Sequence, residues 1–287
     1  MARRKPPTTH GLAVVDKPAG VTSHDVVAML RKRFDERQVG HAGTLDPDAT
    51  GVLLVGVGKA TRLLRFLTAL GKTYTADVVL GTSTSTLDAS GEVTATFDMS
   101  AVTGDMARVA AAEHLTGPIM QIPPMVSAVH VDGRRLHELA REGIEVERQP
   151  RPVTVYSFVV SDTADPSVLR IEVRCSAGTY IRTLADDLGR LLGGGAHLRD
   201  LRRTAVGSFT ELEARSPDEC VLITPVDALR DYPRVTVDAA RADMVRHGRV
   251  LDRFAGAGPW AVVDEGGSLL AVYELFGLAA KPAVVIA

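Results

Sequence analysis

The chain has 287 residues, of which 45% are hydrophobic and 24% charged, and its formal net charge is −2. These values are typical of a globular protein with one large and one small domain. Two cysteines exclude a disulfide framework and a four-cysteine zinc site, and no segment approaches the roughly 20 apolar residues of a membrane-spanning helix. The basic first residues lack an apolar stretch behind them, so we expect no signal peptide and a cytoplasmic protein.

The first 115 residues are predicted to alternate between strands and helices. Apolar runs and period-two alternation predict strands, and apolar residues at helical spacing predict helices. The predicted strands are residues 12–15, 52–57, 73–80 and 93–97, and the predicted helices are residues 22–34, 59–70 and 105–115. Thr22 or Ser23 can cap the first helix, and a threonine and serine run at 82–86 is predicted to be flexible.

Residues 117–152 differ in character because prolines punctuate both ends of the segment. They are predicted to form an excursion from the main sheet, with a strand at 125–131, a turn at 132–133 and a helix at 134–141. After this excursion the predicted elements are strands at 153–161, 168–175 and 198–209, a helix at 180–192, a linker at 229–235, a helix at 239–247, and strands at 260–263, 269–275 and 283–286.

Residues 40–51 read Gly-His-Ala-Gly-Thr-Leu-Asp-Pro-Asp-Ala-Thr-Gly and lead directly into an apolar run. Glycines permit backbone angles and close approaches that a side chain would block. Pro47 favours an extended conformation at Asp46. A carboxylate on a loop that a rigid scaffold aims is a candidate for catalysis, but Asp-Pro is also a common start of a turn. Local chemistry leaves these two interpretations evenly balanced.

The motif closely resembles the catalytic motif of the bacterial tRNA pseudouridine-55 synthase (TruB) family, in which the aspartate of a His-Ala-Gly-Thr-Leu-Asp-Pro run is essential. Other segments similar to the family follow in the family's order, and together they span about residues 10–210. They are residues 15–20 (Val-Asp-Lys-Pro-Ala-Gly), 72–74 (Lys-Thr-Tyr), 86–91 (Thr-Leu-Asp-Ala-Ser-Gly), 175–184 and 195–203.

The resemblance implies an α+β fold with a mixed, mostly antiparallel central sheet flanked by helices, and a small β-rich C-terminal domain of the PUA type. The expected catalytic domain covers residues 1–230, with a thumb-like insertion at about 117–152. The expected RNA-binding domain covers residues 231–287, where similarity to the family is weak. Although the net charge argues against a nucleic-acid partner, basic residues gather in 58–75 and 174–203, and a local basic face can still bind phosphates.

The resemblance implies that Asp46, Tyr74 and Arg182 are catalytic. Asp46 can act as a nucleophile or a general base, and a nearby cation such as Arg182 would lower its pKa. The Tyr74 ring can stack on uracil and its hydroxyl can relay a proton. From the residues alone, Arg182 could equally be a surface arginine, and Tyr74 could equally be a core aromatic residue.

The resemblance also implies a set of residues that bind the substrate. His41 would stack in the space vacated by a flipped base, Lys17 would support the motif loop or contact a phosphate, and Asp88 would tether its neighbourhood or form an ordinary Asx turn. The complete expected set is Lys17, His41, Gly43, Thr44, Asp88, Tyr180 and Leu201, the last two lining the base pocket. No metal or cofactor is expected.

The predicted function is isomerisation of uridine to pseudouridine at position 55 in the T loop of tRNA, with the base flipped and no cofactor. The expected partner is the tRNA T loop and stem, with no obligatory protein partner, no membrane and a monomeric enzyme. Two alternatives are a non-catalytic module that binds or folds RNA, and a guide-dependent synthase acting on ribosomal RNA. The intact set of Asp46, Tyr74 and Arg182 argues against a pure binder.

Overall fold

A computed structural model describes residues 8–127, 130–131, 134–135, 142, 144 and 146–286. The chain divides into two units. Unit 1 combines Met1–Leu70 with Ala205–Ala287, and unit 2 is Gly71–Thr204. This division differs from the expected domain boundary near residue 230, which stays a prediction. Within the described residues, no helix is long and apolar enough to cross a membrane.

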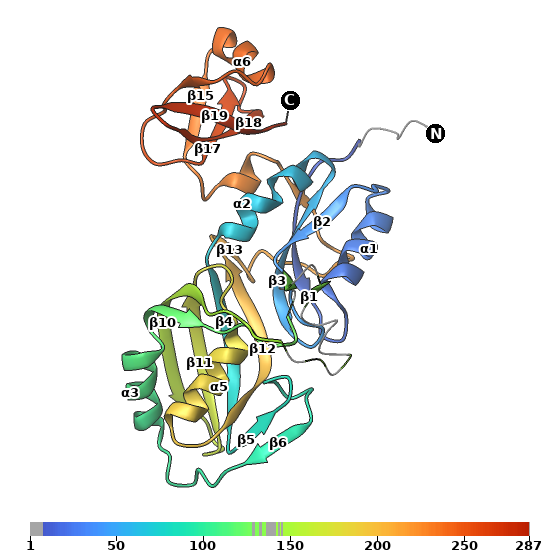
Figure 1. Cartoon of the computed structure of the whole chain (residues 1–287). Coiled ribbons are helices and arrows are strands. Elements are labelled where there is room, and N and C mark those ends of the chain that lie inside the picture. The colour runs from blue at the N-terminus through green and yellow to red at the C-terminus, as the bar shows by residue number, and fades with distance from the viewer. Residues whose placement is uncertain are drawn as a thin grey trace. The chain divides into compact units, whose positions relative to one another are not determined.

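The N-terminal part of unit 1 is an antiparallel group of strands with helix α1 beside them (Figure 1). Strand β1 pairs with β14 and with β3, and β3 also pairs with β2. The elements are β1 (Gly11–Lys17), α1 (Ser23–Arg33), β2 (Val39–Ala42), β3 (Thr50–Val57), η1 (Gly58–Leu63), α2 (Leu64–Ala69), β13 (Phe209–Thr210), β14 (Leu222–Ile223) and η2 (Asp227–Leu229). Every residue of β3 after the first is buried, as its apolar sequence predicts.

The C-terminal part of unit 1 is a five-stranded sheet in the order β15-β17-β18-β19-β16, with one parallel pair, β15 and β17. Its elements are β15 (Arg234–Val237), α6 (Ala239–Arg246), β16 (Leu251–Asp252), β17 (Trp260–Asp264), β18 (Leu269–Phe276) and β19 (Ala279–Val285). The predicted helix and three strands are all present. Trp260 and Tyr273 are fully buried and form the centre of its core.

Unit 2 is built on strands in the order β12-β4-β11-β10-β7, and Figure 1 shows α5 in front of these strands and α3 beside β10. The described pairings of β4, β11, β10 and β7 are antiparallel. The elements are β4 (Lys72–Leu80), β5 (Thr82–Thr84), β6 (Val93–Thr96), α3 (Gly104–His114), β7 (Gly117–Gln121), β10 (Arg151–Asp162), β11 (Val168–Cys175), α5 (Ile181–Leu191) and β12 (Ala196–Val206). Burial alternates along β11 because its apolar residues recur at every second position.

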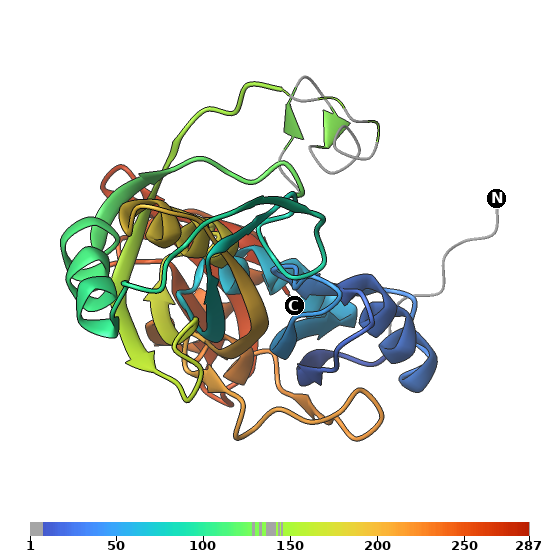
Figure 2. The same cartoon turned by 90° about the horizontal axis from the view of Figure 1, so that it is seen from below.

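The excursion predicted at 117–152 leaves the sheet at the end of β7 and returns to it at the start of β10, and these two strands are neighbours. Strand β7 pairs with β10, and Gln121 lies opposite Arg151. Figure 2 shows the intervening chain reaching away from the sheet toward the short pair β8 (His130–Val131) and β9 (Arg134–Arg135). The two residues that open and close the excursion are therefore cross-strand neighbours.

Two predictions within the excursion need correction. Residues 125–127 are not in a strand, and the predicted helix does not begin at 134, because Arg134–Arg135 is strand β9. Asp-Gly between two short runs is a hairpin signal, and the pairing of β8 with β9 accounts for the strand at Arg134 and Arg135. The predicted turn at 132–133 and the remainder of the predicted helix, apart from its first two residues, lie outside the described residues.

Three other predicted elements differ in detail. The helix predicted at 59–70 begins as 3₁₀ helix η1, in which the Thr61 hydroxyl donates to the Gly58 carbonyl oxygen and so competes with α-helical bonding. The strand predicted at 198–209 is broken by Gly207, which has a positive φ. The run predicted to be flexible contains β5, which pairs with β6.

The predicted linker at 229–235 is also more ordered than expected. Its start belongs to η2 and its end to β15. Between them the Tyr232 hydroxyl donates to the Phe66 carbonyl oxygen at 2.7 Å. A partly buried hydrogen bond from an aromatic hydroxyl therefore holds a segment that its proline and polar residues mark as a connection.

Candidate active site

The motif loop of unit 1 joins β2 to β3, which are antiparallel neighbours, so residues 43–49 form the connection of a hairpin. Gly43 has a φ of 86° and Gly51 a φ of 101°, both in the region that favours glycine. These two glycines turn the chain on either side of Asp46. The requirement for glycine inferred from the sequence is met at both positions.

Asp46 lies half-buried at the first position of a turn. Its carbonyl oxygen accepts a hydrogen bond from the Ala49 N–H at 3.2 Å. The Asp-Pro pair therefore does start a turn, as the local alternative suggested. That role occupies the main chain of Asp46, and it leaves open a chemical role for the carboxylate.

Lys17 ties the residue after Asp46 to the end of β1. Its side chain is completely buried, and Nζ donates to the carbonyl oxygens of Pro47 at 2.9 Å, Pro18 at 2.8 Å and Val21 at 2.7 Å. Since three carbonyls accept from the three N–H groups of the ammonium, a phosphate contact is not available to Lys17. The geometry is that of a residue supporting the motif loop.

The other expected residues of unit 1 lie along the same hairpin. His41 is in β2 opposite Val55 and is partly exposed, and Thr44 is exposed in the loop. Both positions are accessible to a large substrate. Stacking of His41 in a vacated base position stays a prediction.

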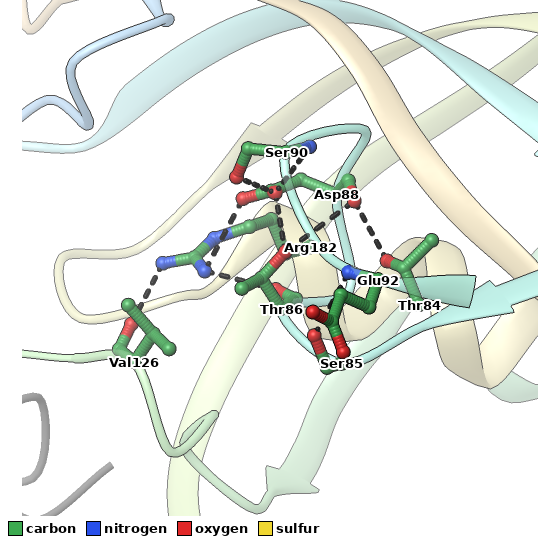
Figure 3. Close-up of polar contacts among 8 residues, drawn as sticks. All are labelled: Thr84, Ser85, Thr86, Asp88, Ser90, Glu92, Val126 and Arg182. Atoms are coloured by element: carbon green, nitrogen blue, oxygen red, sulfur yellow. Dashed lines mark hydrogen bonds and ion pairs between the residues drawn. The ribbon is translucent and has the colours of Figure 1, made fainter. Parts of the chain in front are cut away.

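Arg182 lies in the first turn of α5 and joins two separate segments of unit 2 (Figure 3). Its side chain is nearly buried. The guanidinium donates to the Thr86 carbonyl oxygen at 3.0 Å and to the Val126 carbonyl oxygen at 2.8 Å, and it pairs with Asp88 at 3.4 Å. Arg182 is therefore not the surface arginine that the sequence alone allowed.

Asp88 makes both kinds of contact that the sequence left open. Its Oδ1 accepts from the Ser90 N–H at 3.1 Å, as in an Asx turn, and from the hydroxyls of Ser90 and Thr86 at 2.6 Å (Figure 3). Its Oδ2 faces Arg182. The residue before it, Leu87, has a φ of 63°, a strained conformation for leucine. The turn therefore presents the carboxylate that pairs with Arg182.

Tyr180 caps the N-terminus of α5 without a side-chain cap bond of its own. The Tyr180 N–H donates to Gln121 Oε1 at 2.7 Å, and Gln121 Nε2 donates to the Tyr180 carbonyl oxygen at 3.0 Å. Gln121 is 2% exposed. A buried amide at the base of the excursion thus fixes the backbone two residues before Arg182.

Tyr74 lies on the buried side of β4, in the same face of the strand as Lys72. On β11 their partners are Val173 and Cys175. Burial, with the nearby charge of Arg203, lowers the pKa of Lys72 to about 8. Burial raises the pKa of the Cys175 thiol to about 11, so this cysteine is a core residue and not a reactive thiol.

The structure brings together some of the expected residues and places others in different units. Arg182 and Asp88 are in contact, with Tyr180 two residues away. Leu201 is half-buried in β12 of unit 2. Asp46 belongs to unit 1, whereas Tyr74 and Arg182 belong to unit 2. The approach of Asp46 to the other two catalytic candidates therefore stays a prediction.

Three buried polar residues are not among the site residues that the sequence predicts, and they are Ser23, Lys72 and Gln121. Ser23 and Gln121 bind the main chain of Leu45 and Tyr180, whereas Lys72 lies in β4. The sequence indicates only a helix cap for Ser23, and it marks Lys72 only as part of a segment similar to the family. A single sequence holds no signal for Gln121, because a glutamine at the end of a strand is ordinarily exposed.

Among the residues that the structure describes, no group of three or more histidine, cysteine or acidic side chains could hold a metal ion.

Family models match most of the chain. The model described as TruB family pseudouridylate synthase, N-terminal domain, matches residues 31–181. A tRNA pseudouridylate synthase B C-terminal domain model matches residues 182–220, and a tRNA pseudouridine synthase II C-terminal model matches residues 232–287.

Individual proteins are similar over the full length. The tRNA pseudouridine synthase B of Rhodococcus jostii is 47% identical, covering 99% of this chain and 97% of its own. The protein of the same name from Streptomyces avermitilis is 46% identical, covering 93% of this chain and 94% of its own. A crystal structure of a Cbf5-Nop10-Gar1 complex matches with a TM-score of 0.73 and 26% identity, covering 96% of this chain and 85% of that one.

Proposed function

Since the chain belongs to the TruB family of pseudouridylate synthases, we propose that it converts uridine 55 in the T loop of tRNA to pseudouridine, with Asp46 as the essential carboxylate. The family membership establishes an enzyme that makes pseudouridine. The names of its bacterial relatives support tRNA as the substrate. The motif at residues 40–51 supports position 55, because this is the position that the resembling family modifies.

The observation that carries the proposal is the placement of Asp46. The carboxylate is half-buried at the first position of a turn, and the main chain on both sides of it is tied to buried polar side chains. A rigidly held carboxylate meets the geometric demand of nucleophilic or general-base catalysis. The C-terminal domain of the PUA type adds a second surface for RNA.

The reaction breaks the bond between the ribose and N1 of uracil, rotates the base and forms a bond from the ribose to C5; the C5 proton leaves to water and N1 takes up a proton. The product is an isomer of the substrate, so no redox agent is required. Asp46 acts on the ribose or on the base, Arg182 keeps the pocket cationic, and Tyr74 lies against the uracil. The base leaves its stack at a cost of a few kcal/mol, and His41 fills the gap.

In this proposal the enzyme acts in the cytoplasm as a single chain, without a guide RNA or a protein partner. Lys17, Gly43 and Thr44 shape the motif loop. Asp88 holds Arg182 in place, and Tyr180 and Leu201 line the pocket for the base. RNA loops are recognised by shape and by splayed bases, which fits a site divided among several loops.

The test uses unmodified tRNA transcript carrying uridine tritiated at C5. The wild-type chain alone should release tritium from one uridine per tRNA, and a transcript with cytidine at position 55 should release none. Asp46→Asn should bind the transcript with unchanged affinity and release no tritium. Release by Asp46→Asn at the wild-type rate would refute the role of the carboxylate. Binding without release by the wild-type chain would favour the non-catalytic alternative, and a requirement for added guide RNA would favour the guide-dependent one.

A further inference from the structure

The peptide bond that enters Asp46 is held by one buried hydroxyl. Ser23 Oγ donates to the Leu45 carbonyl oxygen at 3.0 Å and accepts from the Leu45 N–H at 2.9 Å. Ser23 is 2% exposed and Leu45 is 4% exposed, so water has little access to these bonds. The Leu45 carbonyl belongs to the peptide group whose nitrogen is that of Asp46. The orientation of this peptide group therefore helps to set the position of the Asp46 Cα, from which the carboxylate extends.

The helix that contains Ser23 does not need this hydroxyl for its own cap. Thr22 is the N-cap, and its Oγ1 accepts from the Asp25 N–H at 3.0 Å. Asp25 Oδ2 in turn accepts from the Thr22 N–H at 2.8 Å, which completes a capping box. The Ser23 hydroxyl is thus free to serve a segment 22 residues away in the sequence.

We propose that Ser23 is a positioning residue for Asp46, an inference that rests on the proposed function. A hydroxyl combines a donor and an acceptor on one atom, which is what binding both polar groups of Leu45 requires. Lys17 holds the carbonyl of Pro47 on the other side. With both neighbours of Asp46 held, the main chain that carries the carboxylate has little freedom to move.

Loss of the hydroxyl should affect catalysis more than substrate binding. In Ser23→Ala both polar groups of Leu45 lose their partner, and the loop relaxes toward water. A misplacement of about 1 Å at a reacting group can cost about 100-fold in rate. We therefore expect kcat for tritium release to fall by about 10- to 100-fold, with KM for tRNA within about twofold of wild type.

Thr22→Ala is the matched control. It weakens the same helix by removing the cap, and the described hydrogen bonds of the Thr22 side chain go to Asp25 and not to the motif loop. We expect it to lower Tm at least as much as Ser23→Ala and to keep kcat within about twofold of wild type. Ser23→Thr keeps the hydroxyl and should restore most of the lost kcat. If Ser23→Ala fails to fold, Ser23→Cys replaces it, because a thiol is a weaker donor and acceptor.

The inference is overturned if Ser23→Ala keeps wild-type kcat, if Thr22→Ala loses kcat to the same extent, or if Ser23→Thr is as slow as Ser23→Ala. Asp46→Asn is measured alongside. Absence of tritium release by the wild-type chain would refute the proposed function itself, and activity in Asp46→Asn would refute the role of the carboxylate that Ser23 is proposed to position. An inactive Asp46→Asn together with a fully active Ser23→Ala would refute only the role of Ser23.

Discussion

The motif loop around Asp46 and the start of helix α5 around Arg182 are held in opposite ways. In unit 1, buried side chains bind the main chain of Leu45 and Pro47, the two neighbours of Asp46. In unit 2, the Arg182 side chain is itself the tie, since it binds two carbonyls and the carboxylate of Asp88. Around Asp46, the residues that hold the loop differ from the residue that is proposed to do the chemistry. At Arg182, one side chain does both.

The largest expected effect is a difference in the free energy of unfolding between the variants Arg182→Met and Asp46→Asn. Removing the guanidinium leaves the partly exposed carboxylate of Asp88 without this cation and the carbonyls of Thr86 and Val126 without this donor. This should lower the free energy of unfolding by about 2–3 kcal/mol and abolish tritium release. Asp46→Asn keeps the shape of the side chain, so its free energy of unfolding should change by less than about 1 kcal/mol. Urea denaturation of both variants measures the difference. An equal loss of stability in the two variants would contradict the conclusion that the Arg182 side chain holds its surroundings and the Asp46 side chain does not.

A comparable effect on stability is expected at Gln121, which holds unit 2 in the manner of Ser23 in unit 1. Gln121→Leu removes both hydrogen bonds to the main chain of Tyr180 and should lower the free energy of unfolding by about 2–3 kcal/mol. Gln149→Leu is the control, because that glutamine is exposed. The midpoint of urea unfolding, at constant m-value, is the measurement. Equal midpoints for the two variants would show that the bonds to Tyr180 contribute nothing.

The smallest expected effect is on the pH dependence of stability, and it concerns Lys72, a buried residue of strand β4. Its pKa is lowered from 10.5 to about 8 in the folded chain. Between these values the unfolded chain binds a proton that the folded chain has released, so stability rises with pH. From pH 8 to 9, wild type should gain about 1 kcal/mol relative to Lys72→Met.

Cys175 acts with the opposite sign in the same pH range. Its pKa is raised from 9.0 to about 11, so the unfolded thiol ionises first and stability falls as the pH rises through 9. Wild type and Lys72→Met both keep this thiol, so the difference between their unfolding curves at pH 8, 8.5 and 9 reports on the lysine. A difference between wild type and Lys72→Met that stays flat over this range would mean that the ammonium is not buried in solution.

Predictions from the sequence were most accurate where the signal is local. Alternation in Val168–Cys175 and helical spacing after Tyr180 are contained in the segments themselves, and both elements formed as predicted. They were least accurate in two places. In the excursion, Arg134–Arg135 forms a strand where the spacing predicts the start of a helix. At Gly58, a bond from the Thr61 hydroxyl to the Gly58 carbonyl oxygen accompanies a 3₁₀ helix in place of the predicted α-helix. Local periodicity reports which face of an element is apolar, and it does not report competing hydrogen bonds.

The sequence by itself determined the family and the candidate carboxylate, because a motif depends on neighbouring residues. It indicated that Gly40, Gly43 and Gly51 permit unusual backbone angles, and the structure shows a positive φ at Gly43 and Gly51. Only the tertiary structure decided which polar side chains hold the candidates. Arg182 meets Thr86 across 96 residues and Gln121 meets Tyr180 across 59. Such bonds form only after distant segments have folded together and excluded water, so no local sequence pattern predicts them.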